Sequence, residues 1–230
     1  MEDIQSLITK LGVPFANPKL LQQALVHRSY INEHPQFELG HNERLEFLGD
    51  AVLEIIVTEY LYHKYPDQPE GVLTDWRASL VNAKTMADVA TELELENYLY
   101  LSKGEAKDKN TKARQYILAN AIEAVIGAMY LDSGMENVKT LIHRYLISKL
   151  DYILDNELFH DPKSRFQEKS QDLYNITPHY EVLKEYGPDH NKTFEIGVYI
   201  KDKLIAVGVG TSKQEAQVDA AAKGLAKNEW

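Results

Sequence analysis

The stretch that decides the fold of this chain runs from Asn42 to Glu54 and reads N-E-R-L-E-F-L-G-D-A-V-L-E. With 3.6 residues per helical turn, it predicts a helix that has one acidic side and one apolar side. The acidic side carries Glu43, Glu46, Asp50 and Glu54. The apolar side, expected to face the core, carries Leu48, Ala51, Val52, Ile55 and Ile56.

The acids at positions 46, 50 and 54 follow one another at a spacing of four residues. Like charges at this spacing repel by roughly 0.2–0.5 kcal/mol per pair. Arg44, the cation within the stretch, points about 100° away from Glu43 around the helix. We therefore expect a bound divalent cation to offset the repulsion.

A second helix with an isolated acid is expected at Ile117–Leu131, which reads I-L-A-N-A-I-E-A-V-I-G-A-M-Y-L. It is apolar on every side apart from Asn120 and Glu123, so it should be buried. An ionised glutamate in a core is costly unless it is paired with a cation or a metal. Two readings follow: Glu123 forms a structural pair with an arginine, or it meets Glu46 and Asp50 around a metal ion. Three or four oxygen ligands around an open site suit Mg²⁺.

The composition excludes several classes of protein. The chain has 230 residues, 44% hydrophobic and 26% charged, as in ordinary soluble proteins of one or two domains. It contains no cysteine, which excludes disulfides, zinc–thiolate sites and cysteine nucleophiles. No apolar run reaches the length of a membrane span, and the N-terminus lacks the pattern of a secretory signal. These features predict a cytoplasmic protein without a membrane partner.

The charge is distributed unevenly. The whole chain carries a net charge of −10, which argues against a uniformly basic nucleic-acid binder. Residues 161–230 contain 10 Lys and Arg and 11 Asp and Glu, so most of the negative charge lies before them. Any binding of nucleic acid must therefore come from local patches, and we expect it to weaken strongly with salt.

The hydrophobic period changes along the chain and predicts two domains. Residues 1–154 read as helices, with apolar periodicity at Leu20–Val26, Leu45–Leu61, Leu73–Val89, Ile117–Leu131 and Val138–Leu154. The polar segment 155–161 ends in Asp-Pro and is expected to be a linker. Residues 162–230 then predict a helix (Lys163–Tyr174), strands (Tyr180–Tyr186, Thr193–Ile200 and Leu204–Val209) and a closing alanine-rich helix (Lys213–Lys227).

These patterns carry a family resemblance. The run N-E-R-L-E-F-L-G-D-A-V-L resembles the signature motif of ribonuclease III, and the order α-β-β-β-α resembles its double-stranded-RNA-binding domain. The resemblance implies an all-α endonuclease domain followed by an α-β-β-β-α RNA-binding domain. It implies Mg²⁺-dependent cleavage of double-stranded RNA, with Mn²⁺ able to substitute and no small-molecule substrate. The products should have 5′-phosphates, 3′-hydroxyls and short 3′ overhangs, and the targets should include ribosomal and messenger RNA precursors.

The resemblance also assigns site residues. Glu46, Asp50, Asn120 and Glu123 match the positions that hold the metal and carry catalysis, while Glu43 and Glu70 match acids that lie beside the cleavage site. Here the chain departs from its family, which usually has an aspartate at the position of Asn120. An amide oxygen can coordinate Mg²⁺ but brings no charge, so we expect weaker metal binding. The alternative is an RNA-binding protein whose catalysis Asn120 has weakened.

The predicted RNA-binding residues lie in the second domain. An A-form duplex is read by shape, 2′-hydroxyls and phosphates across its shallow groove. Ser212–Glu215 has the form of a capping box, so Ser212 should begin the last helix and offer an anion site beside Lys213. The full set is Gln167, Glu168 and Gln171 of the first helix, Pro188, His190 and Asn191 of the β-β loop, and Ser212 and Lys213.

The resemblance finally implies a homodimer. Family members pair through the signature helix, whose aromatic residue, here Phe47, packs into the partner. The alternative is that Phe47 belongs to the ordinary core of its own chain. A symmetric pair would place two metal sites across one duplex, which would explain cleavage of both strands.

Overall fold

A computed structural model describes residues 3–109, 111–156, 159, 161–188, 192–228 and 230. The chain divides into two compact units, Met1–Phe159 and His160–Trp230. Phe159 follows the last helix of the first unit and packs edge-on against Trp76, with 5.9 Å between the ring centroids. Within the described ranges, no helix has the length and apolar composition needed to cross a membrane.

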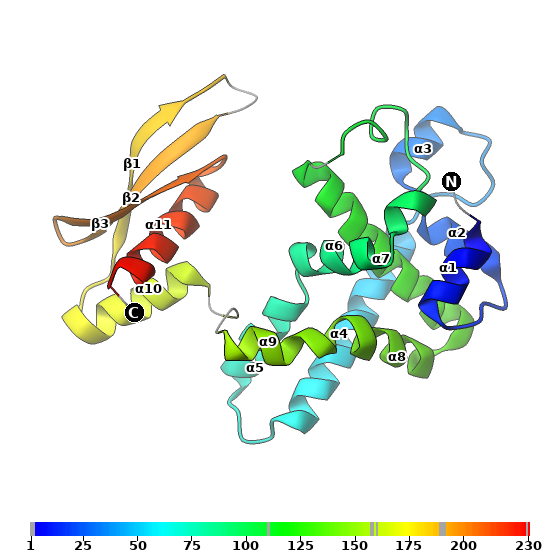
Figure 1. Ribbon diagram of the computed structural model, residues 1–230, viewed down its shortest axis with the longest axis horizontal. Helices are drawn as coiled ribbons and strands as arrows, with labels where there is room; N and C mark the ends of the chain where they lie inside the picture. The colour runs from blue at the N-terminus through cyan, green and yellow to red at the C-terminus, as the bar shows by residue number, and fades with distance from the viewer. Residues whose placement is uncertain (1–2, 110, 157–158, 160, 189–191, 229) are drawn as a thin grey trace. The chain divides into compact units, whose positions relative to one another are not determined.

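The first unit is built from helices around one hydrophobic core (Figure 1). They are α1 (Ile4–Leu11), α2 (Pro18–Ala24), α3 (Arg28–Glu33), α4 (Glu43–Lys64), α5 (Glu70–Leu80), α6 (Ala83–Glu92), α7 (Lys112–Ser133), α8 (Met135–Tyr145) and α9 (Leu150–Asp155), with 3₁₀ turns η1 (Leu95–Tyr98) and η2 (Ile147–Lys149). The two longest, α4 and α7, lie against each other through the centre of the unit.

The start of α4 is held by a buried polar residue. Asn42, only 3% exposed, donates its backbone N–H to the carbonyl of Val26, which follows α2, at 2.9 Å. Its side-chain amide donates to the Ala24 carbonyl at 3.2 Å. Because both bonds fix the residue directly before Glu43, they set the direction in which the acidic side of α4 begins.

Two of the expected helices are interrupted. Leu73–Val89 is not one helix, because Asn82 ends α5 and begins α6 by accepting the N–H of Thr85 at 3.0 Å. Val138–Leu154 is likewise divided, with α8 ending before Leu146 and η2 leading into α9. Local capping thus overrides the continuous apolar pattern at Asn82.

The expected apolar side of α4 is only partly correct. Val52 and Ile56 are buried, and Leu48 packs against the core. Ala51 and Ile55 are instead exposed. The reason is that α7 covers a face centred on Leu45, Gly49, Val52, Leu53 and Ile56, which leaves the adjoining apolar face uncovered in this chain.

The second unit is a three-stranded antiparallel sheet with two helices on one face (Figure 1). Its elements are α10 (Pro162–Tyr174), β1 (His179–Tyr186), β2 (Thr193–Ile200), β3 (Lys203–Gly210) and α11 (Lys213–Asn228). The predicted order α-β-β-β-α is therefore confirmed. Val198 and Ile200 of β2 lie in a core that contains Phe166 of α10 and Ala220 of α11, and Ile196 of the same strand is also buried.

Candidate active site and RNA-binding face

Two glycines let α4 and α7 approach until their backbones touch. A Cβ on Gly49 would lie 1.7 Å from the Glu123 carbonyl oxygen, and a Cβ on Gly127 would lie 2.2 Å from the Leu45 carbonyl oxygen. Only glycine fits such contacts. The crossing therefore occurs one residue from Asp50 on α4 and at Glu123 itself on α7, so the acids of both helices share one region.

The acids of the two helices perturb one another. Burial, followed by the negative charges of Asp50 and Glu46, raises the pKa of Glu123 to about 7. Burial, followed by the charge of Glu43, also raises the pKa of Glu46, and Asp50 adds to this shift. No cation is among the influences on Glu123. Glu123 thus lies close enough to Asp50 and Glu46 for both charges to act on it.

Asn120 has a definite partner in this cluster. Its side chain forms a hydrogen bond with Glu46 that lowers the pKa of that carboxyl and so opposes part of the upward shift. A carboxylate can only accept, so the Asn120 amide is the donor. An aspartate in the same place would add a negative charge instead of a donor. Asn120 therefore stabilises ionised Glu46 in a way that an acid could not.

The acids at both ends of the acidic side of α4 lie beside basic side chains that the helical spacing did not predict. Glu43 lies 3.7 Å from Arg28 and 3.7 Å from Nδ1 of His41, and Glu54 lies 3.9 Å from Arg77. The expectation that no cation of the chain relieves the repulsion is therefore wrong at both ends. The arginines come from α3 and α5, and their approach is set by the fold rather than by helical spacing.

The central acids and Asn120 carry the oxygen donors that hard divalent ions prefer. Glu46, Asp50 and Glu123 supply carboxylate oxygens and Asn120 supplies an amide oxygen, which is the donor chemistry that Mg²⁺ prefers. Among the described residues, no three His, Asp or Glu side chains are arranged to hold an ion by themselves. Because Mg²⁺ keeps several waters and commonly binds one or two carboxylates plus phosphate oxygens, this looser arrangement is compatible with it.

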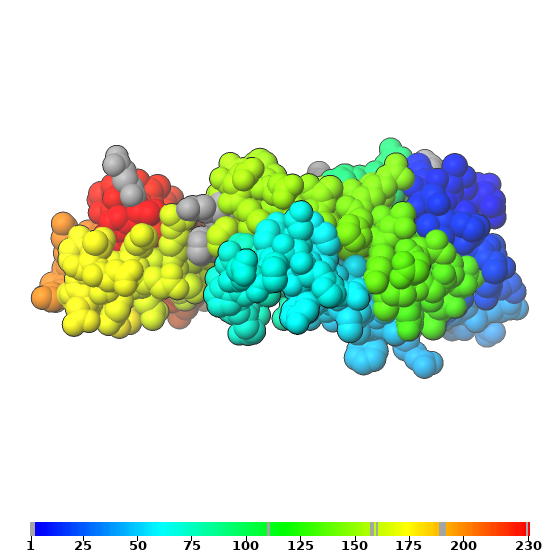
Figure 2. Space-filling view, turned by 90° about the horizontal axis from the view of Figure 1, so that it is seen from below, coloured from blue at the N-terminus to red at the C-terminus, as the bar shows by residue number. Residues whose placement is uncertain are grey.

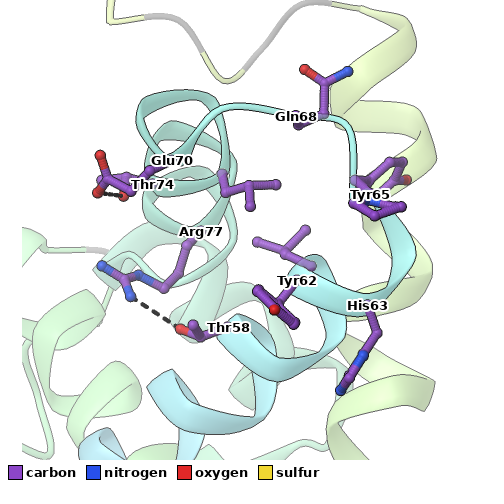
Figure 3. Close-up of a pocket in the computed structure, with 11 residues that line it drawn as sticks. Thr58, Tyr62, His63, Tyr65, Gln68, Glu70, Thr74 and Arg77 are labelled. Carbon is purple, nitrogen blue, oxygen red and sulfur yellow. Dashed lines mark hydrogen bonds between the residues drawn. The ribbon is translucent and has the colours of Figure 1, made fainter.

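Glu70 lies in a neighbouring pocket rather than among the central acids. The pocket, of about 540 Å³, is formed by the end of α4, the turn that follows and α5 (Figure 3). Thr74 donates its hydroxyl proton to Glu70 at 3.0 Å, and Arg77 donates to the Thr58 hydroxyl at 3.0 Å. Figure 2 shows the segment between α4 and α5, in cyan, at the surface of the first unit.

An apolar stripe runs along the uncovered face of α4. Phe47 is 81% exposed, Ile55 59% and Tyr62 67%. With Ala51, these residues recur at helical spacing on one face, and Tyr62 also lines the pocket that contains Glu70. The reading of Phe47 as ordinary core of its own chain is therefore wrong. Large exposed apolar residues in a row are typical of an interaction surface.

The expected RNA-binding residues are exposed or at element ends in the second unit. Gln167, Glu168 and Gln171 are exposed on α10, and Pro188 is exposed after β1. Ser212 accepts the N–H of Glu215 at 3.2 Å and so begins α11, as predicted, although the Glu215 carboxylate returns to the N–H of Thr211 at 3.0 Å. The predicted residues His190 and Asn191 lie outside the described residues.

Lys213 is exposed at the first turn of α11, where its ammonium lies 5.9 Å from the centre of the Phe194 ring. Free backbone N–H groups and the helix dipole make such a helix start attractive to a phosphate. The geometry of Ser212 and Lys213 is therefore suited to an RNA backbone.

Several residues that shape the site were not singled out from the sequence. Gly49 and Gly127 were signalled by isolated glycines inside helical patterns, which often mark close packing. Arg28, His41 and Arg77 gave no such signal, because their partners are distant along the chain or depend on the approach of another helix.

Comparison with known proteins gives a family match for each of the two units. Residues 17–150 match the family model described as ribonuclease-III-like, and residues 162–228 match the model of the double-stranded RNA binding motif. The fold and the site thus define a nuclease unit of the ribonuclease III type joined to a double-stranded-RNA-binding domain.

Whole-chain relatives agree with this class. "Ribonuclease 3" of Carboxydothermus hydrogenoformans is 46% identical over 224 residues, which span 97% of this chain and 95% of that protein. "Ribonuclease 3" of Dehalococcoides mccartyi is 42% identical over 98% of this chain and 94% of that protein. The nuclease domain of ribonuclease III from Campylobacter jejuni superposes with a TM-score of 0.55 at 39% identity, covering 62% of this chain and 95% of that structure. The chain belongs to the ribonuclease III family and is an endoribonuclease, which confirms the resemblance read from the signature helix.

Proposed function

We propose that this endoribonuclease hydrolyses double-stranded RNA with Mg²⁺ held by Glu46, Asp50, Glu123 and the amide oxygen of Asn120. The observation that carries the proposal is the crossing of α4 and α7 at Gly49 and Gly127, which brings Glu123 close to the acids of α4. In agreement with this, burial and the charges of Asp50 and Glu46 raise the pKa of Glu123 to about 7. A divalent cation relieves the repulsion that otherwise favours protonation of the cluster. Mn²⁺ has similar ligand preferences and should substitute.

When bound, the ion would polarise the phosphodiester and lower the pKa of a coordinated water. The residues of the chain itself position the acids that would hold the ion. Gly49 and Gly127 hold the two acid-bearing helices in backbone contact, and the hydrogen bond from Asn120 opposes part of the upward pKa shift of Glu46. Glu43 lies one helical turn from Glu46 and is occupied by Arg28 and His41, which supports a role beside the site rather than on the ion.

The products we propose are short duplexes with 5′-phosphates, 3′-hydroxyls and 3′ overhangs. We further propose that the cytoplasmic targets include precursors of ribosomal and messenger RNA. Both proposals rest on membership of the ribonuclease III family.

We propose that the active form is a homodimer joined through the apolar stripe of α4. Phe47, Ala51, Ile55 and Tyr62 form one exposed face of α4, and a two-fold interface uses the same face of both chains. The pocket beside Tyr62, about 540 Å³ in volume, is large enough to receive an aromatic ring such as the partner's Phe47. The related Campylobacter jejuni nuclease domain is described as flexible in a region involved in dimer formation.

In the proposed homodimer, Glu70 would lie close to the partner chain. It lines the same pocket as Tyr62, so a partner seated on the stripe would lie directly beside it. We therefore propose that Glu70 acts near the cleavage site of the assembled dimer. Arg77, which bonds to Thr58 and lies 3.9 Å from Glu54, links this pocket to the acidic side of α4.

Duplex recognition is proposed for α10, the β1–β2 connection and the start of α11. Gln167, Glu168 and Gln171 are exposed on α10 and can bond to 2′-hydroxyls and base edges. Ser212 and Lys213 offer a phosphate site at the start of α11. The proposal that Pro188, His190 and Asn191 enter a neighbouring groove rests on the family resemblance.

One experiment tests the reaction and the metal together. The purified chain is incubated with a long RNA duplex in Mg²⁺, in Mn²⁺ or in EDTA, and the product ends are analysed by sequencing and by their sensitivity to phosphatase. We expect short duplexes with 5′-phosphates only when metal is present. Cleavage that is equally fast in EDTA would contradict the metal proposal, and binding without cleavage in every metal would contradict the reaction.

A further inference from the structure

A pocket of about 690 Å³ opens at the end of α10 in the second unit. Its floor contains Ile200 of β2 and Ile205 of β3, which are 8% and 7% exposed. Aromatic residues form one wall of the pocket, and charged residues lie at its rim. The volume lies within the range of ordinary small-ligand sites.

The aromatic wall is formed by Tyr174 and Trp230. Tyr174 is 53% exposed, so part of its side chain is accessible to a ligand. The Tyr174 and Trp230 ring centroids are 6.0 Å apart, and the planes are inclined by 45°. Trp230 in turn lies 5.3 Å from the ring of Phe166, which is fully buried. The exposed ring is therefore supported by aromatic packing that continues into the core.

The rim is basic on balance. Lys201 and Lys203 flank Asp202 in the turn between β2 and β3, and all three line the pocket. An apolar floor, an open aromatic ring and two ammonium groups suit a ligand that combines a flat ring with an anionic group. A nucleotide has this combination, since every base has a face that can stack and every phosphate carries charge.

The position of the pocket points to RNA as the source of that nucleotide. Gln167, Gln171 and Tyr174 are spaced i, i+4 and i+7, so they share one face of α10. At 1.5 Å rise per residue, Tyr174 lies about 4.5 Å beyond Gln171 along the helix. A strand that follows the exposed glutamines would therefore reach the pocket without leaving this face.

We propose that the pocket binds an unpaired ribonucleotide that adjoins the duplex, with its base on Tyr174 and its phosphate against Lys201 and Lys203. The ligand is an unpaired nucleotide because bases within an A-form helix are already stacked on their neighbours. The inference rests on the proposed role of α10 in duplex binding. It adds a preference for RNA whose duplex ends in an overhang or a loop.

The test compares two substrates that differ only in their ends. The full-length chain is titrated in EDTA with a blunt RNA duplex and with the same duplex carrying three unpaired uridines at each 3′ end. The variants are Tyr174→Ala, Tyr174→Phe, Lys203→Gln and, as a matched control, Leu173→Ala, which removes a neighbouring exposed side chain that does not line the pocket.

We expect the overhang to strengthen binding to the native chain about tenfold. Tyr174→Ala should remove this gain and leave blunt-duplex affinity unchanged, which also shows that the variant is folded. Lys203→Gln should reduce the gain, while Tyr174→Phe and Leu173→Ala should keep it. Equal affinity of the native chain for both substrates would overturn the inference, and so would an equal loss on both substrates in Tyr174→Ala. Failure of the native chain to bind either duplex would instead overturn the proposed function.

Discussion

Gly49 of α4 faces the backbone of Glu123 in α7 so closely that a Cβ on Gly49 would lie 1.7 Å from the Glu123 carbonyl oxygen. This contact is what brings the acids of two distant segments together. Because the side chains extend from helices in backbone contact, a small displacement of either helix would separate Glu123 from Glu46 and Asp50.

Replacing Gly49 should therefore damage both stability and activity. Gly49→Ala must push α4 away from α7, and overpacking of this kind costs about 1–3 kcal/mol or more. Chemical denaturation measures the loss, and a cleavage assay should show reduced activity at temperatures where the variant is folded. Gly71→Ala is the matched control, since a Cβ there meets nothing within 4 Å. A helical glycine-to-alanine change with open space should stabilise by about 0.4–1 kcal/mol. Equal stabilities of the two variants would contradict the packing argument.

Glu123→Gln should change how stability depends on pH. In the folded chain the pKa of Glu123 is about 7, above its usual value of 4.5, so the folded state favours the protonated carboxyl. This favourable contribution is complete below pH 4.5 and is lost as pH rises through 7. Glutamine cannot ionise. In EDTA, the unfolding free energy of the variant should therefore equal that of the native chain at pH 4.5 and exceed it by a growing amount as the pH rises to 8. Denaturation series at several pH values measure this difference, and a difference independent of pH would refute the raised pKa.

Mg²⁺ should stabilise the two proteins to different extents at pH 8. It should stabilise the native chain, because ligand binding to the folded state adds to its stability, and it should stabilise Glu123→Gln much less. The variant should also lose cleavage.

Asn120→Asp tests the departure from the family pattern. The substitution removes the donor to Glu46 and adds a fourth acid to the cluster, so the metal-free protein should be less stable above pH 7 and should bind Mg²⁺ more tightly. We expect half-maximal cleavage at a several-fold lower Mg²⁺ concentration. An unchanged Mg²⁺ requirement would show that Asn120 has no influence on the ion.

Phe47→Ala should weaken the dimer with little effect on the folding of each chain. Phe47 is 81% exposed, so its removal creates no cavity within its own unit. Sedimentation velocity over a concentration series should show dissociation at concentrations where the native chain remains dimeric. Tyr152→Ala, which removes a side chain 65% exposed on α9, serves as the control and should leave the oligomeric state unchanged. A native chain that is monomeric throughout would rule out the proposed pair.

Lys213→Gln should weaken binding to blunt duplexes of any sequence and reduce the dependence of log affinity on log salt by about one unit. The control is Lys223→Gln on the same helix, because Lys223 is exposed but already paired with Asp219 at 2.7 Å. Filter binding between 50 and 200 mM salt measures both slopes. Identical slopes for the two variants would argue against a phosphate contact at Lys213.

The sequence by itself determined the local structure and the class of protein. Helical spacing placed Glu43, Glu46, Asp50 and Glu54 on one side of α4, and alternation placed Ile196, Val198 and Ile200 on one face of β2. Ser212 was recognisable as the start of α11 because capping depends on residues a few positions apart. These features follow from short-range geometry, which is the same wherever the segment lies.

Only the tertiary structure decided how the segments meet. The break at Asn82, the exposure of Ala51 and Ile55, and the pairing of Arg77 with Glu54 were not apparent from periodicity. The approach of Glu123 to Glu46 and Asp50 likewise required the crossing of α4 and α7. The physical reason is that periodicity tells which side of a helix is apolar or acidic, whereas the neighbour that covers each side is chosen by close packing between residues far apart in the chain.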